Sequence, residues 1–250
     1  IGGEQVIAMA GSEISGFLSN PNVATLPLFL LMGSFAAVAG VAEDLYRLAQ
    51  ALLGQLTIVV GHDMRPSSVP LSRAFIEGAV LAGADVVDIG LASTDMAYFA
   101  SGLLDAPAAQ FTASHNPAQY NGIKMCRAQA APIGEATGLL QIKEAVARGL
   151  VERAEEPGRV RQQGLLEDFA RHVRSFLSDP AALRPLRVVA DTANGMGGLV
   201  VPAVFEALPF DLTILYPELD GTFPNHPADP IQPENLVDLQ RAVLEHGADI

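Results

Sequence analysis

The sequence predicts an α/β fold, made of two α/β/α sandwich domains whose mixed sheets are mostly parallel. Segments typical of strands and of helices alternate from Glu43 to the end of the chain, as in a sheet that helices cover. Half of the 250 residues are apolar and 17% are charged, which is enough apolar material for two ordinary cores. A charged stretch with Pro and Gly, from Glu152 to Gly164, divides the series in two.

The first domain is expected at residues 43–150. Its strands are short apolar runs, such as Leu56 to Val60, which suit a buried parallel sheet. Apolar residues recur near helical spacing from Leu71 to Leu81, and Ser67 or Ser68 can cap the start of that helix. We expect strands at 56–60, 84–89, 108–112 and 122–126, and helices at 43–53, 68–82, 94–104 and 136–148.

The second domain is expected at residues 165–250, after a linker at 151–164. It shows the same alternation of strands and helices, without the fixed period of a solenoid. We expect helices at 165–177, 198–207 and 233–246, and strands at 186–190 and 212–216.

Residues 1–42 do not show this alternation. Residues 23–42 are almost wholly apolar and, at ~20 residues, long enough to cross a bilayer. Pro27 interrupts the run, and acidic Glu4 and Glu13 stand where a signal peptide carries positive charge. We therefore favour a buried stretch over a membrane-spanning or signal segment.

Charge and cysteine content limit the partners and the compartment. The net charge of −13 repels a polyanion, and no basic stripe with aromatic residues offsets it, which argues against nucleic acid. A small anionic substrate fits if cations gather locally. The single cysteine, Cys126, cannot form an internal disulfide and has no ligand spacing for zinc. This suits a reducing compartment, and we expect a cytoplasmic protein.

One loop combines the residue types that phosphoryl transfer needs. Thr112 to Pro117 follows an expected buried strand, and ligands gather at the carboxyl ends of parallel strands. Ser114 stands beside His115 in this loop, and Lys124, one of only two lysines, follows closely. A serine that accepts and returns a phosphoryl group needs nearby cations and an acid/base, which Lys124 and His115 can supply. The alternative is an ordinary turn at 114–117, since Ser and Asn-Pro are common turn residues.

The sequence around this loop resembles the phosphoserine loop of the phosphohexomutases. Thr-Ala-Ser-His-Asn-Pro at 112–117, with Asn-Gly-Ile-Lys at 121–124, carries the resemblance most specifically. The other segments that are similar to the family are 61–68, 88–94, 131–134, 191–198 and 220–226. The resemblance covers roughly residues 43 to 250, and it is to the amino-terminal two domains of the phosphomannomutase/phosphoglucomutase group.

The resemblance implies a role for each residue of the site. Ser114 would be phosphorylated in the active enzyme, and its phosphate would also be a ligand of the essential Mg²⁺. Lys124 would be the general acid and base, and His115 would line the same site. Residues that would order the loop or bind phosphate and substrate are Arg65, Asn116 and Asn121.

The resemblance also implies the reaction. The family is a group of isomerases, intramolecular phosphotransferases that move a phosphoryl group between positions 1 and 6 of a hexose phosphate. The reaction passes through phosphoserine and a bisphosphate intermediate, with a hexose 1,6-bisphosphate as activator. The expected partner is therefore a small-molecule hexose phosphate, and the sequence leaves the oligomeric state open.

The chain departs from the family pattern at three places. Nothing in residues 1–42 resembles the family's arginine-bearing Tyr-Asp-Ile-Arg-Gly turn, and His62 stands where an Arg is usual. The family's metal loop, Asp-Gly-Asp-x-Asp-Arg, is expected beyond Ile250, with the aspartates that complete the Mg²⁺ site. We therefore expect the 250-residue chain to be a fragment without turnover of its own.

Other interpretations compete with a mutase. One is a catalytically inactive, phosphohexomutase-like binding or regulatory module. A serine hydrolase is disfavoured because no G-x-S-x-G elbow occurs and because Ser114 and His115, as neighbours, point apart on extended backbone. The glycines of 191–198 suggest a phosphate cradle, but Val200 replaces the third glycine of a dinucleotide fingerprint, so we expect a structural turn. Residues 220–233 are expected to be a packing loop.

Overall fold

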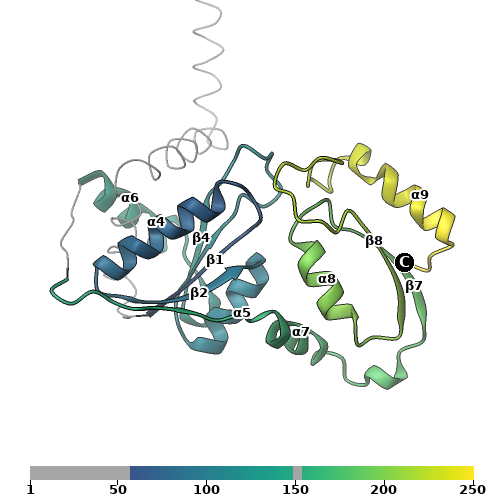
Figure 1. Cartoon of the computed structure of the whole chain (residues 1–250), viewed down its shortest axis with the longest axis horizontal. Helices are drawn as coiled ribbons and strands as arrows, with labels where there is room; N and C mark the ends of the chain where they lie inside the picture. Colours follow the sequence, from purple (N-terminus) through teal and green to yellow (C-terminus); the bar gives the residue numbers. More distant parts are fainter. Residues whose placement is uncertain (1–56, 149–153) are drawn as a thin grey trace, which may run out of the picture.

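The computed structural model describes residues 57–148 and 154–250, which form two α/β parts lying side by side (Figure 1). The helix expected at 43–53 and the stretch 1–42 lie outside the described residues. No helix in the described ranges is both long enough and apolar enough to cross a membrane.

A six-stranded mixed sheet forms the centre of the first part. Its strands, in spatial order, are β5 (Ala131–Pro132), β4 (Ile123–Arg127), β3 (Ala108–Phe111), β1 (Thr57–His62), β2 (Asp85–Leu91) and β6 (Val160–Gln162). Strand β1 pairs in parallel with β2 and β3, and β2 pairs in parallel with β6. Strand β4 runs antiparallel to β3 and β5. The expected mostly parallel mixed sheet is confirmed here.

Strand β6 lies inside the stretch 151–164, which the sequence predicts to be a linker. Its three residues are all exposed, so their side chains carry no apolar pattern that marks a strand. Backbone hydrogen bonds fix it instead: Val86 N–H donates to the Arg159 carbonyl at 2.7 Å, and Gln163 N–H donates to the Asp88 carbonyl at 2.9 Å. The segment between the parts therefore also completes the first sheet.

Alternate residues of the central strands face two helical layers, which makes the first part an α/β/α sandwich. The core under α4 (Ser68–Leu81) and α6 (Leu139–Arg148) contains Ile58, Val60, Phe75, Val86, Phe111 and Ile142. The core under α5 (Thr94–Leu104) contains Val59, Val87, Met96, Ala100 and Cys126. Short 3₁₀ turns lie at Ala128–Ala130 and Glu135–Thr137.

The start of α4 differs from the expected serine cap. Ser67 occupies the N-cap position, yet its side chain makes no capping hydrogen bond. Asn121 Nδ2 instead donates to Ser67 Oγ at 2.8 Å and to Ser68 Oγ at 2.9 Å. The two hydroxyls therefore connect Asn121, at the end of the loop between β3 and β4, to the start of α4.

The second part is built on two parallel strands, β7 (Leu186–Asp191) and β8 (Phe210–Leu215). Its helices are α7 (Leu166–Arg174), α8 (Gly197–Phe205) and α9 (Val237–His246), with 3₁₀ turns at Pro180–Ala182 and Pro233–Leu236. Leu165 and Phe169, at the start of α7, are buried in the core under α5. The Phe169 ring centroid lies 5.7 Å from that of Phe99 on α5. Helix α7 therefore links the two parts through apolar contacts.

Candidate active site

A cleft of about 650 Å³ lies between the two parts. The first part contributes the residues that follow β1, β2 and β3, and the second part contributes those that follow β7 and β8. Residues on both walls include Asp63, Ser93, Ser114, His115, Lys124, Asp191 and His226. Because the carboxyl ends of parallel strands face the cleft, it lies where open α/β sheets bind their ligands.

Ser114 and Lys124 meet at the wall of this cleft. Lys124 Nζ donates to Ser114 Oγ at 2.7 Å. Lys124 is exposed and Ser114 is half-buried, so a ligand in the cleft can reach both. Ser114 has a φ of 53°, in the left-handed region that non-glycine residues seldom adopt. Its own N–H donates to Thr112 Oγ1 at 3.1 Å, which helps to hold this conformation.

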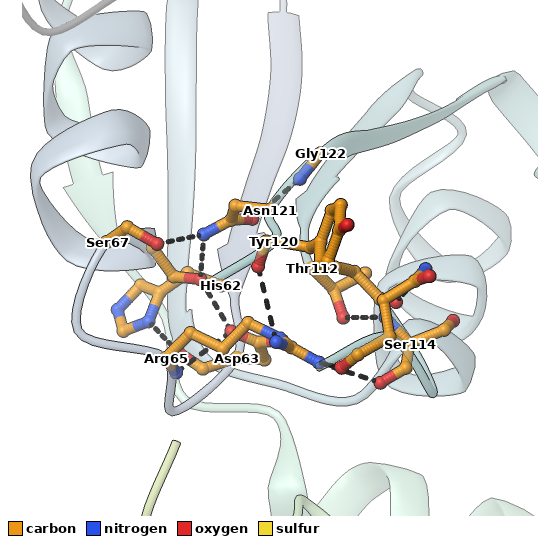
Figure 2. A network of polar contacts seen from close by, with 12 residues as sticks. His62, Asp63, Arg65, Ser67, Thr112, Ser114, Tyr120, Asn121 and Gly122 are labelled. Atoms are coloured by element: carbon orange, nitrogen blue, oxygen red, sulfur yellow. Dashed lines mark hydrogen bonds and ion pairs between the residues drawn. The ribbon is translucent and has the colours of Figure 1, made fainter. Parts of the chain in front are cut away.

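Arg65 binds the loop that carries Ser114 (Figure 2). Its side chain is fully buried, and its Nε donates to Asp63 Oδ2 at 3.2 Å. Both terminal nitrogens donate to backbone carbonyls of the loop, with Nη2 reaching Ser114 at 2.9 Å. The other carbonyls bound in this way are those of Asn116, Pro117 and Tyr120, at 2.8–3.2 Å.

These hydrogen bonds bear on the two roles expected of Arg65, loop ordering and phosphate contact. A guanidinium has five N–H groups, and the five hydrogen bonds to Asp63 and to the four carbonyls use all of them. No N–H is left for a phosphate. Burial lowers the pKa of Arg65, and the charge and hydrogen bond of Asp63 oppose that shift. The arrangement supports the loop-ordering role and speaks against phosphate contact.

The two asparagines of this loop also form hydrogen bonds within the protein. Asn116 is exposed, and its Nδ2 donates to the Ala113 carbonyl at 2.8 Å, across the tip of the loop. Asn121 is buried, its Nδ2 is shared by two serines, and its Oδ1 accepts from Gly122 N–H at 2.8 Å. These hydrogen bonds tie Asn121 to the start of α4, and its expected role in binding substrate or phosphate stays a prediction. His115 is exposed and lines the cleft.

The second part contributes His226, which lies in the stretch that the sequence predicts to be only a packing loop. His226 Nε2 lies 3.0 Å from Asp191 Oδ2, and Nδ1 lies 2.9 Å from the Pro227 carbonyl. Burial lowers the pKa of His226, but its hydrogen bonds to Pro227 and Asp191 and the charges of Asp191 and Asp238 together raise it above the ordinary value. Since both ring nitrogens face acceptors, the protonated imidazolium fits this position. Asp191 directly follows an expected strand, but nothing in the sequence pattern pairs it with His226.

Both parts of the chain match models of one known protein family. Residues 35–151 match the α/β/α domain I of phosphoglucomutase/phosphomannomutase, and residues 167–250 match α/β/α domain II. The chain belongs to the phosphoglucomutase/phosphomannomutase family. This confirms the resemblance seen in the sequence, and with it the expected fold class of two α/β/α domains.

Several members of the phosphoglucomutase/phosphomannomutase family are similar over most of this chain. A "Phosphohexose mutases" protein of Xanthomonas campestris pv. campestris is 39% identical over 212 residues, which cover 83% of this chain and 47% of that protein. A phosphomannomutase/phosphoglucomutase of Pseudomonas aeruginosa is 35% identical, with 84% and 45% covered. The crystal structure of a family protein from Burkholderia thailandensis gives a TM-score of 0.75 at 31% identity, with 85% and 47% covered. The chain thus spans about half the length of the curated relatives it matches.

Proposed function

We propose that the protein acts as a phosphohexomutase, an isomerase that moves a phosphoryl group between positions 1 and 6 of a hexose phosphate. The observation that carries the proposal is the 2.7 Å contact between Lys124 Nζ and Ser114 Oγ at the wall of the cleft. A hydroxyl beside a cation, on an ordered loop at the end of a parallel strand, is suited to accept a phosphoryl group. Membership of the family, whose relatives include phosphomannomutases, supports the same reaction.

The chemistry of one transfer step follows from this pair. Ser114 Oγ attacks a phosphorus atom of a hexose 1,6-bisphosphate in line with the leaving sugar oxygen, so the Oγ–P bond forms as the P–O bond to the sugar breaks. Lys124, whose Nζ donates to Ser114 Oγ, gives a proton to the leaving sugar oxygen and takes up the proton that Oγ loses, so the protons balance. The reverse step returns the phosphoryl group to the other hydroxyl. One serine thus serves both ends of the sugar, and the His115 imidazole also lines the cleft.

The described residues do not fit a complete magnesium site. Among them, no group of three or more His, Cys, Asp or Glu side chains could hold a metal ion. Proteins hold Mg²⁺ with carboxylates together with phosphate oxygens. In this structure Ser114 Oγ has a lysine Nζ, and not a carboxylate, as its hydrogen-bond partner. We therefore propose the phosphate of Ser114 as one Mg²⁺ ligand, and the described ranges do not supply the carboxylates that would accompany it.

Turnover of glucose 1-phosphate and mannose 1-phosphate tests this proposal. The full-length protein, with Mg²⁺ and a trace of hexose 1,6-bisphosphate, is compared with its Ser114→Ala and Ser175→Ala variants. Ser175 is exposed at the end of α7, its hydroxyl donates to the His172 carbonyl, and it is not among the residues that line the cleft, so Ser175→Ala is a matched control. We expect the Ser114→Ala variant alone to lose turnover. Normal turnover in that variant would reassign the phosphoryl acceptor.

A further inference from the structure

A turn of the second part, Asp220–Phe223, lies directly on the Arg65 turn of the first part. Gly221 in this turn is buried. A Cβ placed on Gly221 would lie 2.5 Å from Arg65 Cα, 2.9 Å from the Met64 carbonyl oxygen and 2.9 Å from Pro66 Cδ. Real Cβ atoms essentially never approach other heavy atoms below 3.0 Å, so only glycine permits this contact between the two backbones.

Phe223, from the same turn, covers the guanidinium of Arg65. Its ring centroid lies 5.0 Å from Arg65 Cζ, within the range of a cation–π contact. Phe223 has a φ of 54°, a conformation that a bulky side chain adopts only where its surroundings impose it. The edge of the guanidinium is bound to the Ser114 loop and its face is covered by Phe223, so the second part restricts how Arg65 can move.

The turn is itself fixed to the end of β7. Asp220 N–H donates to the Asn194 carbonyl at 2.9 Å. The Asn194 side chain is buried, donates to the Glu218 carbonyl at 3.0 Å and accepts from Asn225 Nδ2 at 2.8 Å. Because these bonds all meet at one residue just after β7, the turn moves with the second part as a unit.

We propose that Arg65 is a positioning residue for Ser114 and that the Asp220–Phe223 turn holds Arg65 in place, so that the second part controls the geometry of the phosphoryl acceptor. The contacts run without a break from Gly221 and Phe223 to Arg65, and from Arg65 Nη2 to the Ser114 carbonyl at 2.9 Å. Ser114 holds its left-handed backbone at the end of this chain of contacts. Only the consequence for phosphoryl transfer rests on the proposed function.

Hydrogen exchange of the Ser114 loop tests the link without any substrate. The Gly221→Ala variant of the full-length protein is compared with Gly102→Ala, because a Cβ on Gly102 in α5 meets nothing within 4 Å. Amides of Ser114, Asn116 and Tyr120 donate within the loop, so loosening it exposes them. We expect faster exchange in the peptide 113–121 for Gly221→Ala and wild-type exchange for Gly102→Ala. Wild-type exchange in a folded Gly221→Ala variant would overturn the proposal.

Two Phe223 variants decide the question even if Gly221→Ala does not fold. Phe223→Leu keeps an apolar side chain but removes the ring from Arg65, whereas Phe223→Tyr keeps the ring. We expect faster exchange of 113–121 in Phe223→Leu and rescue in Phe223→Tyr, since a cation–π contact needs the aromatic face. Equal exchange in both variants, at the wild-type rate, would overturn the role of Phe223.

Single-turnover labelling of Ser114 by a labelled hexose 1,6-bisphosphate links the same variants to the reaction. We expect Phe223→Leu to slow labelling by ~10-fold or more, with little change in the bisphosphate concentration that gives half-maximal rate, because misplaced reacting groups slow transfer rather than binding. If peptide 113–121 exchanges faster in Phe223→Leu but Ser114 is not labelled even in the wild type, the proposed function would be contradicted and the positioning link would stand. Normal exchange with normal labelling in Phe223→Leu would overturn the link and leave the function.

Discussion

Ser114 and Lys124 are brought together by the antiparallel pairing of β3 and β4. Lys124 lies opposite Gln110 in this pairing, and the loop between the strands returns so that Nζ reaches Ser114 Oγ. The buried Arg65 binds four carbonyls of that loop, which fixes its path before any ligand arrives. At the scale of single residues, catalysis would therefore depend on a geometry already set in the free protein.

The role of Lys124 can be separated from simple phosphate binding. In the full-length protein, Lys124→Ala should lower kcat by ~10²-fold or more, the scale of general acid and base catalysis, and change KM less. Lys124→Arg is the control, because arginine keeps the positive charge and does not release its proton. Steady-state kinetics with a hexose 1-phosphate measures both constants. An effect confined to KM, or full activity in Lys124→Arg, would make Lys124 a phosphate-binding residue only.

The His226 and Asp191 pair predicts a dependence of stability on pH. The pKa of His226 is raised in the folded protein, because the hydrogen bonds and negative charges of its neighbours outweigh burial, which lowers it. Its stabilising contribution is therefore complete below the unfolded pKa of ~6.5 and is lost as pH rises through the folded pKa. Urea unfolding should show that His226→Gln is most destabilised relative to wild type at about pH 5.5, with a smaller difference at about pH 9. A difference that grows with pH would contradict this.

At the residue scale, the sequence predicted some of the site and missed the rest for identifiable reasons. The loop position of Ser114 and the nearby Lys124 follow from strand ends and from the motif at 112–117. The carbonyl bonds of Arg65 do not, because backbone acceptors leave no trace in the pattern of side chains. The partners of Asn121 do not follow from the motif either, because the Ser67 and Ser68 hydroxyls lie 54 and 53 residues away in sequence.

At the scale of elements, strands and helices with a clear apolar pattern were predictable. Helix α4 and strand β1 lie within one or two residues of their expected bounds, because apolar spacing follows the face that each element buries. Strand β6 was not predictable, since its residues are exposed and its place depends on backbone pairing with β2. The unexpected contact of α7 with the first core rests on Phe169, an aromatic residue with no sequence signal for its partner.

Core packing of α4 gives a test at this scale. Phe75 is fully buried, and its ring centroid lies 5.6 Å from that of Phe111 on β3. Phe75→Ala should lower the free energy of unfolding by ~3–5 kcal/mol, the range for removing a buried aromatic ring. Phe176→Ala is the matched control, since Phe176 is 74% exposed, and its effect should stay within ~0.5 kcal/mol. Denaturant unfolding that gave equal losses would contradict the assigned core.

At the scale of the whole molecule, the cleft between the two parts unites the observations. Its walls come from strand ends of both sheets, and α7 and the Asp220–Phe223 turn connect the two parts. The domain boundaries expected from sequence, 43–150 and 165–250, stay a proposal. Strand β6 and Phe169, which lie beyond residue 150, both pack into the first part. We propose that this cleft presents Ser114 as the phosphoryl carrier.

Tandem mass spectrometry of the full-length protein can show whether Ser114 carries the phosphoryl group. The protein is incubated with glucose 1,6-bisphosphate labelled in its phosphates, digested, and the label is assigned to a residue. We expect label on Ser114, no label in the Ser114→Ala variant, and normal labelling in Ser175→Ala. Label on another residue, with the same yield in Ser114→Ala, would contradict it.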